Sequence, residues 1–162
     1  RLVGASGLYV TEPVGGPAGQ PDYINAVLEV RTSLDPYALL ALCQQVEAHH
    51  HRVRLVRWGP RTLDIDVITY DDLVSDGPVL TLPHPRAHER AFVLVPWEQA
   101  NPQAVIPSCD AATGEQTRHL VADLARRVRA ADERAGVNAV RFMRDMNLPK
   151  NLFDSGAESE GV

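Results

Sequence analysis

Residues 57–66 read RWGPRTLDID, and together with the VITY that follows they carry the clearest structural signal in the chain. Apolar and mostly branched side chains dominate from Thr62 to Tyr70, which predicts a strand. Residues i and i+2 of a strand point to the same face. We therefore expect Asp64 and Asp66 to project together, while the apolar residues beside them enter the core.

Four arginines precede the two aspartates: Arg52, Arg54, Arg57 and Arg61. Guanidinium groups match phosphate oxygens bidentately, and the Gly-Pro pair among them predicts a loop able to close over a substrate. Taken alone, the aspartates fit the solvated face of an edge strand as well as they fit a Mg²⁺ site. The neighbouring arginines favour the Mg²⁺ site over the solvated strand face. The block therefore predicts a site for a metal-bound polyphosphate, with ATP as the leading candidate.

The sequence upstream predicts two further strands, because residues 8–11 and residues 23–31 alternate in polarity. In the second run, Ile24 and Leu28 are expected on the core face, and Tyr23 and Asn25 on the other. An aromatic ring beside a primary amide suits a flat heterocycle, although ordinary cross-strand packing explains the same pair.

Helices are predicted on both sides of the arginine block. Asp35 and Pro36 fit the N-cap and first position of a helix. Its half-buried face would consist of Leu39, Leu40, Cys43 and Val46. Downstream, residues 93–98 predict a short or kinked helix, and residues 116–131 an amphipathic one. The order of elements indicates an α+β domain with a mainly antiparallel sheet.

Length and composition limit the classes of protein that fit. We expect one domain over residues 1–150 and a disordered tail over residues 151–162. The net charge of −5 argues against general binding to nucleic acid or to an anionic membrane. Two cysteines without metal or redox spacing fit a reducing compartment. We expect a cytoplasmic, monomeric protein that binds small molecules.

Four segments, in this order, resemble 6-hydroxymethyl-7,8-dihydropterin pyrophosphokinase, an enzyme of folate synthesis. They are residues 9–15 (YVTEPVG), 20–27 (QPDYINAV), 57–66 (RWGPRTLDID) and 83–92 (PHPRAHERAF). The resemblance implies a ferredoxin-like antiparallel sheet flanked by helices. It also implies transfer of pyrophosphate from ATP to the hydroxymethyl group of a dihydropterin, with release of AMP.

The resemblance further implies roles for individual residues. Asp64 and Asp66 would hold two Mg²⁺ ions that bridge the ATP phosphates, and Arg52 and Arg61 would join them in catalysis. The residues at ATP would be Glu47, Arg54, Arg57, Trp58, His84 and Arg90. The residues at the pterin would be Thr11, Pro13, Val14, Tyr23, Asn25 and Phe92, with the ring between Tyr23 and Phe92.

One departure from the family concerns its usual opening, a strand that carries Gly-Ser-Asn-Leu-Gly and a long helix. Arg1 corresponds to a point just after them, so we expect a fragment or a misplaced start. We also expect the strand of Asp64 to be separated from the strand of Tyr23, with unpaired edges. Two alternatives to the enzyme stay open. One is a non-catalytic remnant that binds nucleotide or pterin, and the other is an interaction domain whose arginine loop binds an acidic partner.

Overall fold

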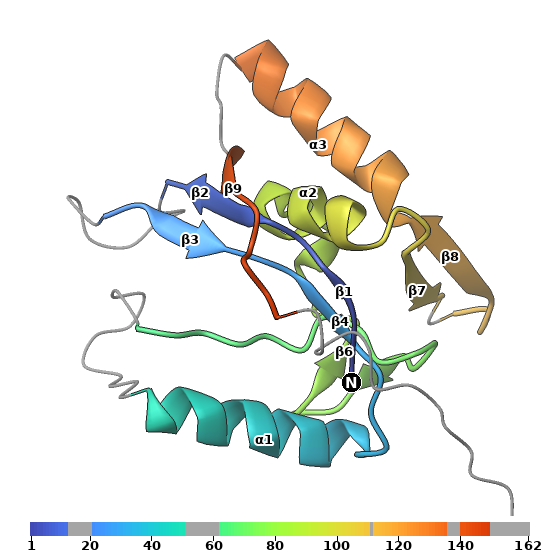
Figure 1. Cartoon of the computed structure of the whole chain (residues 1–162). Helices are drawn as coiled ribbons and strands as arrows, with labels where there is room; N and C mark the ends of the chain where they lie inside the picture. Colours follow the sequence, from blue (N-terminus) through green and yellow to red (C-terminus); the bar gives the residue numbers. More distant parts are fainter. Residues whose placement is uncertain (13–20, 51–61, 111, 136–139, 150–162) are drawn as a thin grey trace, which may run out of the picture.

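The structure is a computed structural model that describes residues 1–12, 21–50, 62–110, 112–135 and 140–149. In this part of the chain, helices and short antiparallel strands alternate, which confirms the predicted α+β class (Figure 1). The strands are β1 (Leu2–Ala5), β2 (Leu8–Thr11), β3 (Tyr23–Asn25), β4 (Leu28–Val30), β5 (Ser75–Asp76), β6 (Thr81–Leu82), β7 (Val105–Cys109), β8 (Gln116–Leu120) and β9 (Val140–Arg144). The helices are α1 (Pro36–His49), α2 (Ala91–Ala100) and α3 (Val121–Ala135), with a short 3-10 turn, η1 (Ala87–Glu89).

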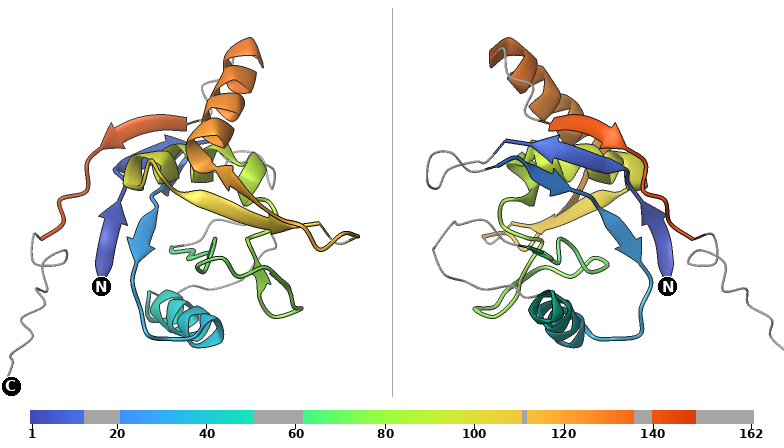
Figure 2. Two further views of the ribbon diagram at one scale, coloured as in Figure 1. Left: turned by 90° about the vertical axis from the view of Figure 1, so that its right-hand side faces the viewer. Right: turned by 60° about the vertical axis from the view of Figure 1, so that its left-hand side comes forward.

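A long antiparallel ribbon forms the centre of the molecule. β1 pairs with β4, with a shift of register between Leu2 and Gly4, and β2 pairs with β3; the two pairs meet where Ser6 faces Val27. There the Ser6 N–H donates to the Val27 carbonyl at 2.9 Å, and the Val27 N–H donates to Ser6 Oγ at 2.9 Å. The strand predicted at residues 8–11 is confirmed, and the run at residues 23–31 becomes the two strands β3 and β4. β9 adds to the outer edge of β2 (Figure 2).

Helix α2 covers one face of this ribbon and joins it to the hydrophobic core. It contacts all four strands of the ribbon and packs against α3. Leu94 of α2 and Val121 of α3 are fully buried, and Ile106 of β7 lies in the same cluster. The short helix predicted around Pro96 is confirmed, with that proline buried inside it.

The predicted core face of β3 and β4 is wrong. Ile24 is 59% exposed and Leu28 is 54% exposed, whereas Tyr23, Asn25 and Val27 are half-buried. Val27 packs against the core cluster that α2 helps to form. The side of the ribbon on which α2 lies therefore determines the buried face, and strand alternation alone leaves that choice open.

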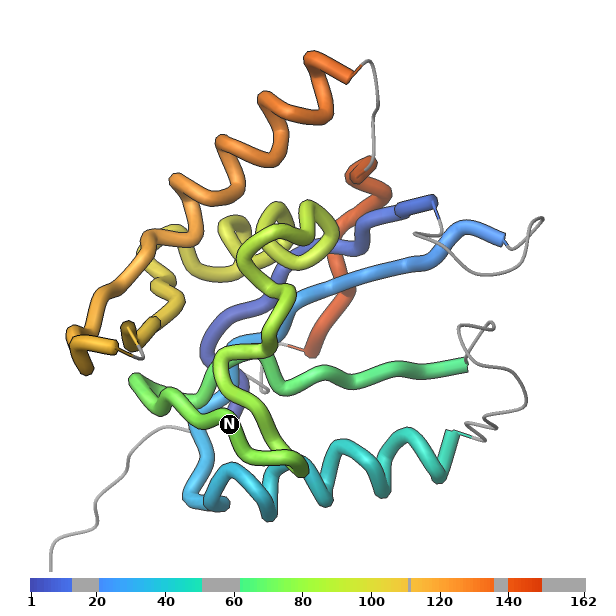
Figure 3. Tube along the Cα trace, turned by 180° about the vertical axis from the view of Figure 1, so that it is seen from behind, coloured from blue at the N-terminus to red at the C-terminus, as the bar shows by residue number. Residues whose placement is uncertain are grey.

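The strand predicted from Thr62 to Tyr70 is also wrong, because this segment has no strand pairing within the described part of the chain. It runs between β3 and α1 without joining the sheet of β3 (Figure 3). Extended backbone becomes a strand only when a neighbour completes the hydrogen-bond ladder. The separation from the strand of Tyr23 that the resemblance led us to expect is present.

Helix α1 begins as predicted, since Asp35 Oδ1 accepts the N–H groups of Tyr37 and Ala38 at 2.9 Å. Its buried face differs from the prediction at one position. Val46 is exposed, and the neighbouring Glu47 is buried instead.

The helix predicted at residues 116–131 begins later. Residues 116–120 form β8, which pairs with β7, and α3 follows from Val121. The turn that connects β7 to β8 is held by Asp110. Its Oδ1 accepts the N–H of Ala112 at 2.9 Å and that of Thr113 at 2.7 Å. Pairing with the preceding strand in this hairpin therefore takes residues 116–120, and the amphipathic helix begins only after them. The predicted tail lies outside the described residues, and no helix within them is long and apolar enough to cross a membrane.

Candidate active site

The segment that carries the two aspartates keeps its alternating pattern without a ladder. Asp64 and Asp66 are both exposed, and Ile65 between them is half-buried, so both aspartates lie on the exposed side of the segment, in the alternation that the sequence predicts. Side chains hold the segment to α1 at its start. The Ile65 N–H donates to Glu47 Oε1 at 2.7 Å, and Thr62 Oγ1 donates to the His50 carbonyl at 2.8 Å.

The far end of the segment is held by one side-chain bond and one backbone bond. The Tyr70 hydroxyl donates to the Leu34 carbonyl at 2.7 Å, just before α1 begins. The His84 N–H donates to the Ile68 carbonyl at 2.8 Å, which brings the chain after β6 alongside the segment. The second bond places His84 beside Ile68, two residues after Asp66.

His84 lies in a mixed electrostatic environment. Burial lowers the pKa of its imidazole from the ordinary value, the nearby Asp66 carboxylate raises it, and the Arg90 guanidinium lowers it. His84 Nδ1 accepts the N–H of Arg86 at 3.2 Å, so the neutral ring carries its proton on Nε2. Asp66, His84 and Arg90 therefore form one electrostatic group with a hydrogen-bond donor at Nε2.

Arg90 links this group to the start of α2. Its guanidinium carbon lies 5.4 Å from the centre of the Phe92 ring, a distance typical of a cation–π contact. Phe92 in turn packs against the core cluster. Arg90, a candidate for ATP binding, and Phe92, a candidate for pterin binding, are thus adjacent, and the start of α2 holds both.

The other aromatic and amide candidates lie on β2 and β3, the strands that α2 contacts. Thr11 faces Tyr23 across the ladder, and Tyr9 faces Asn25. Asn25 Nδ2 donates to Thr11 Oγ1 at 2.7 Å, and Thr11 is only 4% exposed. The buried Thr11 hydroxyl therefore orients the Asn25 amide, and the remaining polar atoms of that amide can face a ligand.

The two aspartates suit a hard divalent cation. In the described part of the chain, no third histidine, cysteine or carboxylate joins them in a group able to hold a metal. Mg²⁺ usually takes one or two protein carboxylates and completes its shell with water and phosphate oxygens. The donor set therefore fits Mg²⁺ bound together with a polyphosphate.

Several predicted site residues lie outside the described residues: Pro13, Val14, Arg52, Arg54, Arg57, Trp58 and Arg61. Glu47 is described, and its carboxylate contacts the backbone of the aspartate segment. That contact was not predicted. An acid at the spacing of Leu40 and Cys43, on the buried face of α1, is the sequence signal that could have indicated it.

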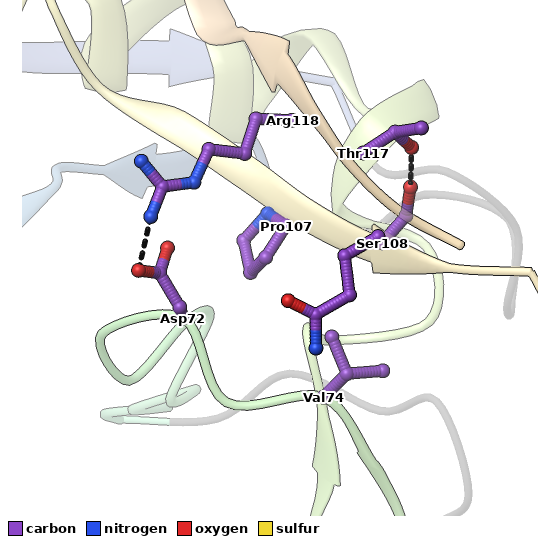
Figure 4. Close-up of a pocket in the computed structure, with 7 residues that line it drawn as sticks. Asp72, Val74, Pro107, Ser108, Thr117 and Arg118 are labelled. Carbon is purple, nitrogen blue, oxygen red and sulfur yellow. Dashed lines mark hydrogen bonds and ion pairs between the residues drawn. The ribbon is translucent and has the colours of Figure 1, made fainter. Parts of the chain in front are cut away.

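A shallow hollow of about 190 Å³ lies elsewhere, between the β7–β8 ribbon and the turn after Tyr70 (Figure 4). Its wall includes an ion pair between Arg118 and Asp72. None of its lining residues is among the predicted site residues, and we assign it no role in the reaction.

Comparison with known proteins bears on the same residues. The model of the 7,8-dihydro-6-hydroxymethylpterin-pyrophosphokinase family matches residues 1–102. A 2-amino-4-hydroxy-6-hydroxymethyldihydropteridine pyrophosphokinase of Haemophilus influenzae is 42% identical over 113 residues, 70% of this chain and 70% of that protein. The protein of the same name from Pseudomonas aeruginosa is 43% identical over 107 residues, 66% of this chain and 65% of that protein.

A folic acid synthesis protein of Schizosaccharomyces pombe is 32% identical over 158 residues, 98% of this chain and 21% of that protein. The chain thus spans about two thirds of the length of the bacterial relatives and about a fifth of the fission-yeast protein. The family match covers well over half of the 162 residues and includes every predicted site residue, so the chain belongs to the 7,8-dihydro-6-hydroxymethylpterin-pyrophosphokinase family.

Proposed function

We propose that the chain transfers pyrophosphate from ATP to 6-hydroxymethyl-7,8-dihydropterin, giving AMP and the pterin diphosphate in folate biosynthesis. One observation carries the proposal. The Arg90 guanidinium carbon lies 5.4 Å from the centre of the Phe92 ring, and the charges of Arg90 and Asp66 both act on His84, so a candidate for phosphate binding and a candidate for binding a flat ring are adjacent at the start of α2.

The reaction joins the hydroxymethyl oxygen of the pterin to the β-phosphorus of ATP. The bond from that phosphorus to the oxygen bridging the α-phosphate breaks, AMP leaves with the electron pair, and the hydroxyl proton is released. His84 Nε2–H and the Arg90 guanidinium are suited to donate to phosphate oxygens. Asp64 and Asp66 would hold two Mg²⁺ ions, whose charge would offset that of the phosphates. Catalysis would rest on positioning and electrostatics.

The pterin would lie between Tyr23 and Phe92, with its polar edge read by the Asn25 amide that Thr11 orients. Pro13 and Val14 would complete this pocket. Arg52 and Arg61 would act in catalysis, Arg54, Arg57 and Trp58 would contact ATP, and Glu47 would belong to the ATP side of the site. We also propose that the chain works as a monomer in the cytoplasm, which sedimentation and cell fractionation can test.

An assay of AMP formation tests the proposal, with ATP, Mg²⁺ and the hydroxymethyl-dihydropterin as reactants. Asp64→Ala and Asp66→Ala should each abolish turnover, whereas Asp76→Ala, a control at an exposed carboxylate of β5, should not. ATP binding without AMP formation would instead favour the non-catalytic remnant. Turnover retained by Asp64→Ala would refute the metal assignment.

A further inference from the structure

Glu47 occupies an unusual position for a carboxylate. Among the residues that the structure describes, it is the one charged side chain that is buried, at 4% exposed. Burial of a carboxylate is unfavourable unless hydrogen bonds compensate it. Its Oε1 accepts the N–H of Ile65 at 2.7 Å, within the normal range for such a bond.

The partner of this bond lies between Asp64 and Asp66. The segment from Thr62 to Tyr70 has no strand neighbour among the described residues, and its first half is held by the side-chain bonds at Thr62 and Ile65, so the direction of its backbone there depends on those bonds. A rotation of the peptide at Ile65 would turn the carboxylates on both sides of it, since Asp64 and Asp66 are its neighbours in the chain. Burial also leaves Glu47 almost no surface for a nucleotide.

We propose that Glu47 is a positioning residue. By holding the Ile65 N–H it sets the relative direction of the Asp64 and Asp66 carboxylates, and so the affinity of the site for a divalent cation bound with ATP. This inference rests on the proposed function. In this role Glu47 acts through the position of the acceptor oxygen that it presents to Ile65.

Two conservative substitutions separate geometry from charge. Glu47→Gln keeps the length of the side chain and an acceptor oxygen but removes the charge. Glu47→Asp keeps the charge but is shorter by one methylene, which withdraws the acceptor from Ile65. We expect Glu47→Asp to weaken cation binding about tenfold, as when a hydrogen bond to a charged group is lost, and Glu47→Gln to stay within about threefold of the wild type.

The probe is Mn²⁺, which is titrated into the full chain in the presence of α,β-methylene-ATP. Electron paramagnetic resonance distinguishes bound from free Mn²⁺. This analogue replaces the bridging oxygen at which the reaction cleaves. Glu29→Asp is the matched control, because Glu29 is a carboxylate of β4 that accepts the Asn101 Nδ2–H at 2.7 Å. It should leave Mn²⁺ affinity unchanged. Circular dichroism and thermal melting confirm that each variant is folded, and Glu47→Gln still decides between geometry and charge if Glu47→Asp does not fold.

Unchanged affinity in a folded Glu47→Asp overturns the proposal, and so does a tenfold loss in Glu47→Gln. Asp64→Ala in the same titration separates this outcome from failure of the proposed function. If Asp64→Ala weakens Mn²⁺ binding while Glu47→Asp does not, only the positioning role fails. If Asp64→Ala has no effect, the metal assignment itself fails.

Discussion

The hydrogen bond between Thr11 and Asn25 provides a direct test of the pterin half of the site. Thr11→Val keeps the shape of a buried side chain but removes the oxygen that accepts the Asn25 Nδ2–H at 2.7 Å. The amide then loses the group that orients it. We expect the variant to recognise the polar edge of the pterin less well while its ATP site is unaffected.

The size of the effect follows from the burial of the two partners. A net hydrogen bond contributes about 0.5–1.5 kcal/mol, and more is lost when a polar group is left buried without a partner. Asn25 is half-buried, so its amide can turn partly towards water, which limits the loss in folding stability to about 1 kcal/mol. Reorienting the amide for the pterin should cost a similar amount, which corresponds to a KM about fivefold higher.

Steady-state kinetics with each substrate varied in turn measure this difference. Thr11→Val should raise the KM for the pterin and leave the KM for ATP unchanged, and Thr11→Ser, which keeps the hydroxyl, should resemble the wild type. The reasoning is refuted if Thr11→Val leaves the pterin KM unchanged, or if Thr11→Ser is equally impaired.

Three further predictions concern stability. Leu94 is fully buried in α2, so Leu94→Ala should lower the free energy of unfolding by about 2–5 kcal/mol in a denaturant titration, and a loss below 1 kcal/mol would contradict the core assignment. A Cβ at Gly4 would lie 2.7 Å from the Ala100 carbonyl oxygen, which is too close. Gly4→Ala should therefore push α2 away from β1 and lower the free energy of unfolding by about 1–3 kcal/mol. An unchanged melting temperature would argue against this packing. Burial lowers the pKa of His84 in the folded state. Just below the ordinary value of about 6.5, the unfolded chain therefore binds more protons than the folded chain. The free energy of unfolding should fall as the pH drops through that range. His84→Gln should flatten this dependence, and an equally steep pH profile in that variant would assign it to another group.

Features that depend on residues within one element followed from the sequence, and features that depend on pairing or packing between elements did not. Strand alternation placed Asp64 and Asp66 on one face, and the Asp35-Pro36 pair marked the start of α1. The buried face of β3 depends on α2, whose position alternation cannot indicate. Residues 116–120 form β8 because β7 lies beside them, and helical spacing carries no information about that neighbour.

The two halves of the candidate site are held by different forces, so their failures should be separable. Thr11 and Asn25 belong to ladder-paired strands that α2 covers, and their arrangement depends on packing in the core. The aspartate segment lacks a ladder within the described part of the chain. It is held by one backbone bond, from His84 to Ile68, and by side-chain bonds, of which the one from Ile65 to Glu47 lies between the two aspartates. Segments with few backbone partners open at lower free energy than core strands. Loss of the Glu47 contact should therefore impair the cation site before it affects the pterin pocket, whereas loss of core packing under α2 should impair both together.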